Sequence, residues 1–99
     1  MNPEPQVLRS KKIENDMADD QERQQKLEQL EHLKKLGEKY YDDMYEAHSQ
    51  RDASICYSDA KDCFYDAIGL AERLGLTDEH KALSDRLAHI KAVFRSQFT

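Results

Sequence analysis

The chain has 99 residues, a length typical of one domain with a modest hydrophobic core. Its net charge of -5 and pI near 5.3 disfavour simple binding to nucleic acid or to anionic lipid. No stretch approaches the roughly 20 apolar residues that cross a bilayer. The first residues also lack the apolar run of a signal peptide. We therefore expect a cytoplasmic protein without a membrane span.

Residues 1–18 are expected to form a disordered, flexible N-terminal tail. They contain both prolines of the chain, Pro3 and Pro5, and few apolar side chains. Such a stretch buries too little apolar area to offset the entropy lost on ordering. Residues 19–99 are then expected to form a single helical domain.

An amphipathic helix is predicted over residues 19–48. This stretch has no proline and a single glycine, and its apolar residues recur every three or four positions. The repeating positions are Leu27, Leu30, Leu33, Leu36 or Gly37, Tyr40, Met44 and Ala47. Its first half is highly charged around the leucines, as in a coiled coil. The three leucines Leu27, Leu30 and Leu33 are therefore a candidate self-association seam for a homodimer.

Two shorter helices are predicted over residues 53–74 and 78–97. Ser49 or Asp52 can cap the first of them, and Gly75 can end it in a left-handed conformation. Thr77 can cap the second. Many positions on the apolar stripe of the middle helix are small, which allows a neighbouring helix to come close: Ala53, Ala60, Ala67 and Ala71.

The expected fold class is all-α, with three helices and short connections. Short connections favour antiparallel neighbours, so we expect a long helical hairpin and a C-terminal helix packed on it. Leu33, Leu36, Gly37 and Tyr40 follow the spacing of the first helix of a tetratricopeptide repeat, and Ala60-x-x-x-Phe64-x-x-Ala67 is similar to its second helix. The resemblance covers about residues 33–74 and implies a close-packed hairpin that binds proteins or peptides. It has one copy and a longer connection than the family.

The candidate chemical groups point away from catalysis and from metal binding. Cys56 and Cys63 share a helical face about 10.5 Å apart, beyond the roughly 7 Å limit for a disulfide. They are interpreted as small core residues rather than as part of a zinc site with His48 or His89. No catalytic triad and no glycine-rich phosphate loop is recognisable. We therefore expect neither an enzyme nor a cofactor.

The tyrosines are the most informative side chains. Tyr41, Tyr45 and His48 form a second row beside the inward stripe of the first helix. Either this row widens the core under the third helix, or it forms a binding face. Tyrosine suits a binding face because it joins a large apolar ring to a polar tip. The candidate partner-binding residues are Tyr41, Tyr45, His48 and Tyr65, with Asp42 and Glu46 as an acidic rim.

These observations predict a helical interaction module, such as an adaptor, a chaperone-like protein or a regulator, whose partner is another protein or peptide. The alternative is a small transcriptional or nucleic-acid-associated regulator. Lys81, Arg86, Lys91 and Arg95 favour it, whereas the acidic total charge makes nucleic acid the weaker expectation.

Overall fold

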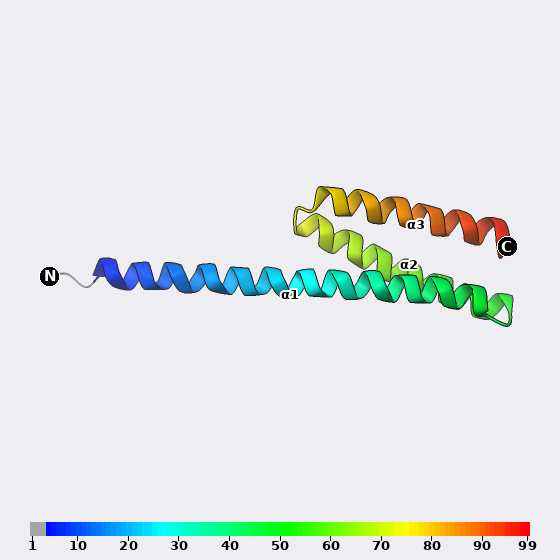
Figure 1. The fold of residues 1–99 in the computed structure, drawn as a ribbon, viewed down its shortest axis with the longest axis horizontal. Coiled ribbons are helices and arrows are strands. Elements are labelled where there is room, and N and C mark those ends of the chain that lie inside the picture. The colour runs from blue at the N-terminus through cyan, green and yellow to red at the C-terminus, as the bar shows by residue number, and fades with distance from the viewer. Residues whose placement is uncertain (1–3) are drawn as a thin grey trace.

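The computed structural model contains three α-helices joined by short turns (Figure 1). It describes the backbone of residues 4–99 and the side chains of residues 20–99. The helices are α1 (Glu4–Glu46), α2 (Gln50–Arg73) and α3 (Thr77–Gln97). No residue in the described range belongs to a strand. The all-α, three-helix prediction is confirmed.

The helix α1 begins well before the predicted residue 19. Pro5 lies in its first turn, where proline costs no internal hydrogen bond. Neither glycine nor proline occurs from residue 6 to residue 36, so nothing in the sequence interrupts the helix. The predicted tail falls partly on residues 1–3, which lie outside the described residues, and its flexibility stays a prediction.

The molecule is elongated, with Cα extents of 75 × 22 × 13 Å. The helix α2 runs back along the second half of α1 and packs against both α1 and α3, while α3 runs in the same direction as α1 (Figure 1). The N-terminal part of α1 extends past the other two helices. The C-terminus lies at the same end of the bundle as the turn between α1 and α2.

The core follows the apolar stripe predicted for the middle helix. Ala60, Ala67 and Ala71 have no exposed surface, and beside them Phe64 is only 1% exposed. Gly37 of α1 lies directly against the ring of Phe64, where an added Cβ would be 2.7 Å from a ring carbon. The two helices of the hairpin can therefore approach closely because one contributes alanines and the other a glycine.

The turns use the expected signals, with one correction. Ser49 caps α2 by accepting a hydrogen bond from the amide of Asp52 at 3.0 Å. Gly75 has a φ of 72°, and the amide of Leu76 donates to the carbonyl of Ala71, which is the Schellman pattern. Thr77 does not cap α3, because it is already the first helical residue and Leu76 holds the cap position without a side-chain bond.

Candidate functional site

Aromatic rings from all three helices meet at the end of the bundle where the chain turns from α1 to α2. We call this group the aromatic end cluster; it consists of Tyr41, Tyr45, Tyr57, Phe94 and Phe98. The ring contacts run in the order Tyr41, Tyr45, Phe98, Phe94 and Tyr57. The centroids of Tyr57 and Phe94 are 3.9 Å apart in a stacked arrangement, whereas Tyr45 meets Phe98 edge-on at 5.5 Å. The cluster joins the three helices at this end.

Only part of the predicted tyrosine face is exposed. The ring of Tyr45 keeps 48% of its surface exposed, but Tyr41 keeps 8% and belongs to the hydrophobic core. The two tyrosines therefore differ. Tyr41 widens the core under α3, which was one of the two alternatives, whereas Tyr45 remains at the surface, as the other alternative requires. The binding role predicted for Tyr41 is corrected to a supporting one, because its ring is covered.

Tyr41 supports Tyr45 directly. Their hydroxyl groups are hydrogen-bonded at 3.1 Å, and their rings meet edge-on at 5.3 Å. Burial of the phenol, together with this hydrogen bond, raises the pKa of Tyr41 to about 12. The Arg86 guanidinium lies 4.9 Å from the ring centroid, a cation–π contact. The neutral phenol is therefore held between a neighbouring tyrosine and a cation.

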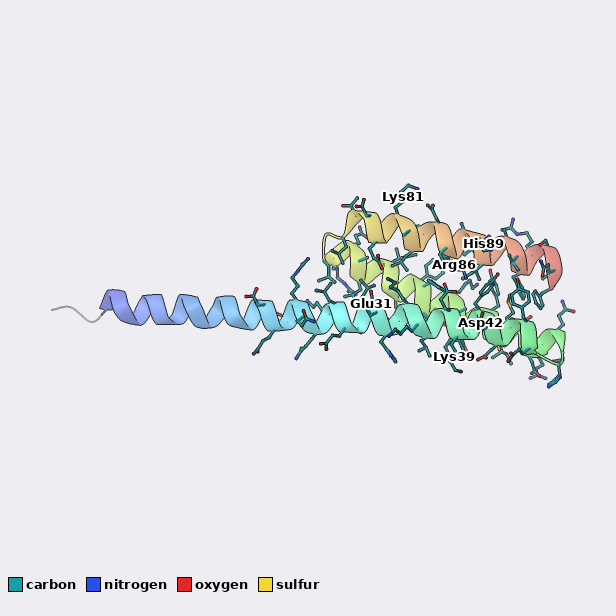
Figure 2. The ribbon with its side chains drawn as sticks, in the orientation of Figure 1. Glu31, Lys39, Asp42, Lys81, Arg86 and His89 are labelled. Carbon is teal, nitrogen blue, oxygen red and sulfur yellow. The ribbon has the colours of Figure 1, made fainter. Side chains whose placement is uncertain are left out.

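Arg86 joins α3 to α1 across this face. It donates two hydrogen bonds to the carboxylate of Glu38, at 2.7 and 2.6 Å, and this ion pair raises the pKa of Arg86. A second bridge joins Lys34 and Glu79 at 2.5 Å. In Figure 2 Arg86 points from α3 toward α1, whereas Lys81 and Lys39 point away from the opposite edges of the bundle. Long charged side chains thus span the space between α1 and α3.

The predicted acidic rim is exposed and free of ion pairs within the described residues. Asp42 and Glu46 lie on α1 beside Tyr45, and neither has a basic side chain within salt-bridge distance there. Asp43 differs, because Lys39 bonds it at 3.2 Å. The two free carboxylates therefore leave negative charge next to an exposed aromatic ring.

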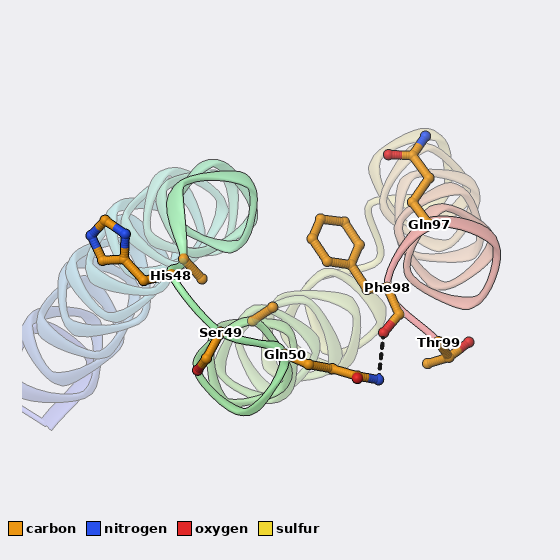
Figure 3. A pocket seen from close by; sticks show the side chains of 8 residues that line it. His48, Ser49, Gln50, Gln97, Phe98 and Thr99 are labelled. Carbon is orange, nitrogen blue, oxygen red and sulfur yellow. Dashed lines mark hydrogen bonds between the residues drawn. The ribbon is translucent and has the colours of Figure 1, made fainter.

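An open hollow of about 410 Å³ adjoins the cluster, between the turn after α1 and the end of α3 (Figure 3). His48 lies on one side of it and is exposed, while Gln97, Phe98 and Thr99 lie on the other. Gln50 donates a hydrogen bond to the Phe98 carbonyl at 2.8 Å and so ties the two sides together. His48 therefore lines the hollow and does not contact the rings of the cluster.

Tyr65 lies apart from the aromatic end cluster. It follows Tyr57 by eight residues on α2, a distance of about 12 Å along a helix. Its hydroxyl accepts a hydrogen bond from Lys91, whose ammonium also lies 4.8 Å from the ring centroid. Tyr65 is half exposed but does not extend the predicted tyrosine row.

The predicted leucine seam is mostly inside the bundle. Leu30 is 2% exposed and Leu33 packs against the core, while Leu27 is partly buried beside Leu76 and Gly75. The physical reason is that the end of α2 and the start of α3 cover this stretch of α1. The seam predicted from Leu27, Leu30 and Leu33 is therefore corrected, since Leu30 is not available to a second chain.

The cysteines behave as apolar neighbours of the core. Cys63 is buried and Cys56 is partly buried, and both are free thiols. Burial and the surrounding aspartates raise the pKa of each thiol, so neither is an activated nucleophile. Within the described part of the chain no three His, Cys, Asp or Glu side chains converge on one point. None of the helices described there is long and apolar enough to cross a bilayer.

Four residues at or beside the cluster were not predicted as site residues from the sequence: Tyr57, Phe94, Phe98 and Arg86. Phe94 and Phe98 stand four residues apart near the end of α3, a spacing that places both rings on one face. That signal was present in the sequence. Which helix this face meets depends on the packing of α3, which the sequence does not give.

Comparison with known proteins gives no relative on which to base a function. No family model, no curated protein and no solved structure matches this chain.

Proposed function

We propose that this chain is a non-catalytic, helical protein-interaction module that binds a partner protein through the aromatic end cluster and its acidic rim. One observation carries the proposal: rings from three helices converge on one end of the bundle, where the half-exposed Tyr45 stands beside Asp42 and Glu46, whose carboxylates have no ion-pair partner among the side chains of residues 20–99. Exposed tyrosine next to charge is typical of protein interfaces, whose strongest contacts are often aromatic.

The site suits binding because two neighbouring rings restrict the position of Tyr45. Tyr45 is held by Tyr41 beneath it and by Phe98 at its side. A ring that is already fixed loses little conformational entropy when a partner covers it. The rim carboxylates would steer a basic partner surface toward the ring.

The tetratricopeptide resemblance forms part of this proposal. The close approach of Gly37 and Phe64 gives its Leu-Gly and Phe spacing a physical basis in this hairpin. A cytoplasmic location is also part of the proposal.

The basic residues of α3 give little support to the nucleic-acid alternative. Lys81 bonds Asp85 at 2.9 Å, Arg86 bonds Glu38, and Lys91 bonds Tyr65. Three of the four basic residues are thus bonded within the chain, and the exposed Arg95 alone does not make a row that could follow a phosphate backbone.

The proposal is tested by capturing partners from cells of the source organism with the wild-type chain, Tyr45→Ala and Tyr65→Ala. Tyr65 is a matched control, because its ring is 50% exposed but stands outside the cluster. We expect a protein that wild type and Tyr65→Ala both retain and that Tyr45→Ala loses. Titration of that purified protein should then show at least about tenfold weaker binding to Tyr45→Ala, the effect of losing an aromatic anchor. Equal binding by all three chains would contradict the assignment.

A further inference from the structure

The helix α1 is much longer than the bundle requires. It has 43 residues, against 24 in α2 and 21 in α3. Among the described side chains, the hydrogen bond from Arg23 to the Leu74 carbonyl marks how far the bundle reaches along α1. The helix N-terminal to that point extends past the bundle (Figure 1). Most of the stability of a helix in a protein comes from packing of one of its faces, so an extension beyond the bundle gains from a partner.

The charges along α1 are complementary to those of a second α1 that runs in the opposite direction. If a second α1 lies antiparallel beside the first with the two Leu27 residues opposite each other, opposed residues have numbers that add to 54. In that register six pairs carry opposite charge: Lys11–Asp43, Lys12–Asp42, Asp19–Lys35, Asp20–Lys34, Arg23–Glu31 and Lys26–Glu28. Asp16–Glu38 alone carries like charge. Because Lys34 and Glu38 are bonded to Glu79 and Arg86 of their own chain, five opposite pairs remain for a second copy.

The bundle leaves much of the matching part of α1 uncovered. Glu28, Lys35, Asp42 and Glu46 are all exposed. Two shallow hollows of about 470 and 350 Å³ lie along this helix and are lined by α1 residues alone. A second helix could therefore approach the charged side of α1 without displacing α2 or α3.

We propose that α1 binds the α1 of a second copy of this chain in antiparallel orientation, with Leu27 near the twofold axis. The basic segment of each copy, Arg9 to Lys12, then lies beside the acidic rim of the other. The overlap between residues 9 and 45 is about 55 Å long, enough for an interface above roughly 1,000 Å². With a twofold axis the same contacts occur twice, so the basic segment of each copy meets the acidic rim of the other.

This proposal deepens the proposed function and rests on it, since it names a second copy as the partner of the acidic rim. It also replaces the leucine seam with a charged interface. Leu30 is buried within its own bundle, so charge rather than a leucine zipper selects the register. An interface of this kind weakens as salt rises, because screening shortens the reach of charge from about 10 Å at 0.1 M to about 3 Å at 1 M.

Zero-length carbodiimide crosslinking of the full chain, followed by mass spectrometry, tests the orientation. Lys11 and Asp42 are 31 residues apart on one helix, or about 46 Å. A direct bond between them can therefore form only between two copies. We expect links from Lys11 or Lys12 to Asp42, Asp43 or Glu46 at about 0.05 M salt and their loss near 1 M salt. Dimers whose links all join equivalent parts of two parallel helices would overturn the proposal.

Charge reversal tests the interface itself by sedimentation equilibrium, with a monomer of 11.6 kDa. One variant carries Lys11→Glu with Lys12→Glu, and the other carries Asp42→Lys with Asp43→Lys. Each alone should raise the dimer dissociation constant at least tenfold, whereas an equimolar mixture should regain the dimer, since every reversed charge then meets its opposite. The matched control is Asp62→Lys with Asp66→Lys on an exposed part of α2, which should leave the dimer unchanged.

A chain that stays monomeric at about 0.1 mM protein and 0.05 M salt overturns self-pairing, and so does a dimer that ignores both reversals. The two proposals fail separately. A monomer that still captures another protein through Tyr45 removes only the self-pairing. A dimer that passes the charge tests, but whose capture of other proteins does not depend on Tyr45, removes the proposed aromatic site.

Discussion

Single positions decide how closely α1 and α2 approach. At Gly37 the nearest atoms to an added Cβ would be ring carbons of Phe64 at 2.7 and 3.0 Å, and that ring is almost fully buried. The ring cannot move aside without disturbing the alanine side of α2. The absence of a side chain at Gly37 is therefore a packing requirement of the hairpin.

Gly37→Ala should destabilise the protein although alanine favours helix formation. The clash costs about 1–3 kcal/mol, against a gain of about 1 kcal/mol in helix propensity. Gly69→Ala is the matched control, because no atom lies within 4 Å of its added Cβ, and it should be neutral or stabilising. Urea unfolding of both variants checks the prediction, which fails if Gly37→Ala is as stable as Gly69→Ala.

The buried phenol of Tyr41 should make the fold sensitive to alkaline pH. Its pKa is raised from 10.0 to about 12, so the folded state favours the neutral form. That contribution is complete below about pH 10, the value for an unfolded chain, and is lost as pH rises toward 12. Between about pH 9 and 11, Tyr41→Phe should therefore lose less stability in urea unfolding than wild type. Parallel losses in the two proteins would contradict a raised pKa at this residue.

At the scale of the elements, the capping residues and the spacing of the apolar residues predict much of the three-helix arrangement. The small stripe of α2 and the role of Gly75 both follow from local rules, and the structure agrees with them. The start of α1 is different, because no breaking residue marks it. The burial of Tyr41 could not be predicted from the sequence either. The helical spacing places Tyr41 beside the core stripe, but the position of α3 decides whether its ring is covered.

The two short connections should respond differently to loss of a hydroxyl. Ser49→Ala removes the bond to the Asp52 amide and should cost about 1 kcal/mol, the usual value of an N-cap. Thr77→Ala should cost much less, because Thr77 holds no cap bond and lies inside α3. Thermal unfolding of both variants makes the comparison, and an equal loss at the two sites would rule out a special role for Ser49.

At the scale of the whole molecule, the pairing of α1 with α3 depends on a few side chains. The helix α2 contacts both neighbours along its length, whereas α1 and α3 are bridged by Glu38–Arg86 and Lys34–Glu79. Arg86 of the first bridge also lies over the ring of Tyr41, which is hydrogen-bonded to Tyr45. The shape of the proposed binding site therefore depends on the position of α3.

A double-mutant cycle on Glu38→Ala and Arg86→Ala should measure this connection. The pair is partly exposed, so we expect a coupling of about 0.2–1 kcal/mol that shrinks in about 1 M salt. Arg86→Ala alone should cost more than Glu38→Ala, because it also removes the cation–π contact with Tyr41. Urea unfolding at low and high salt supplies the four free energies. If the two substitutions are additive at low salt, the bridge does not hold α3 to α1, and the support of Tyr45 must come from the aromatic contacts alone.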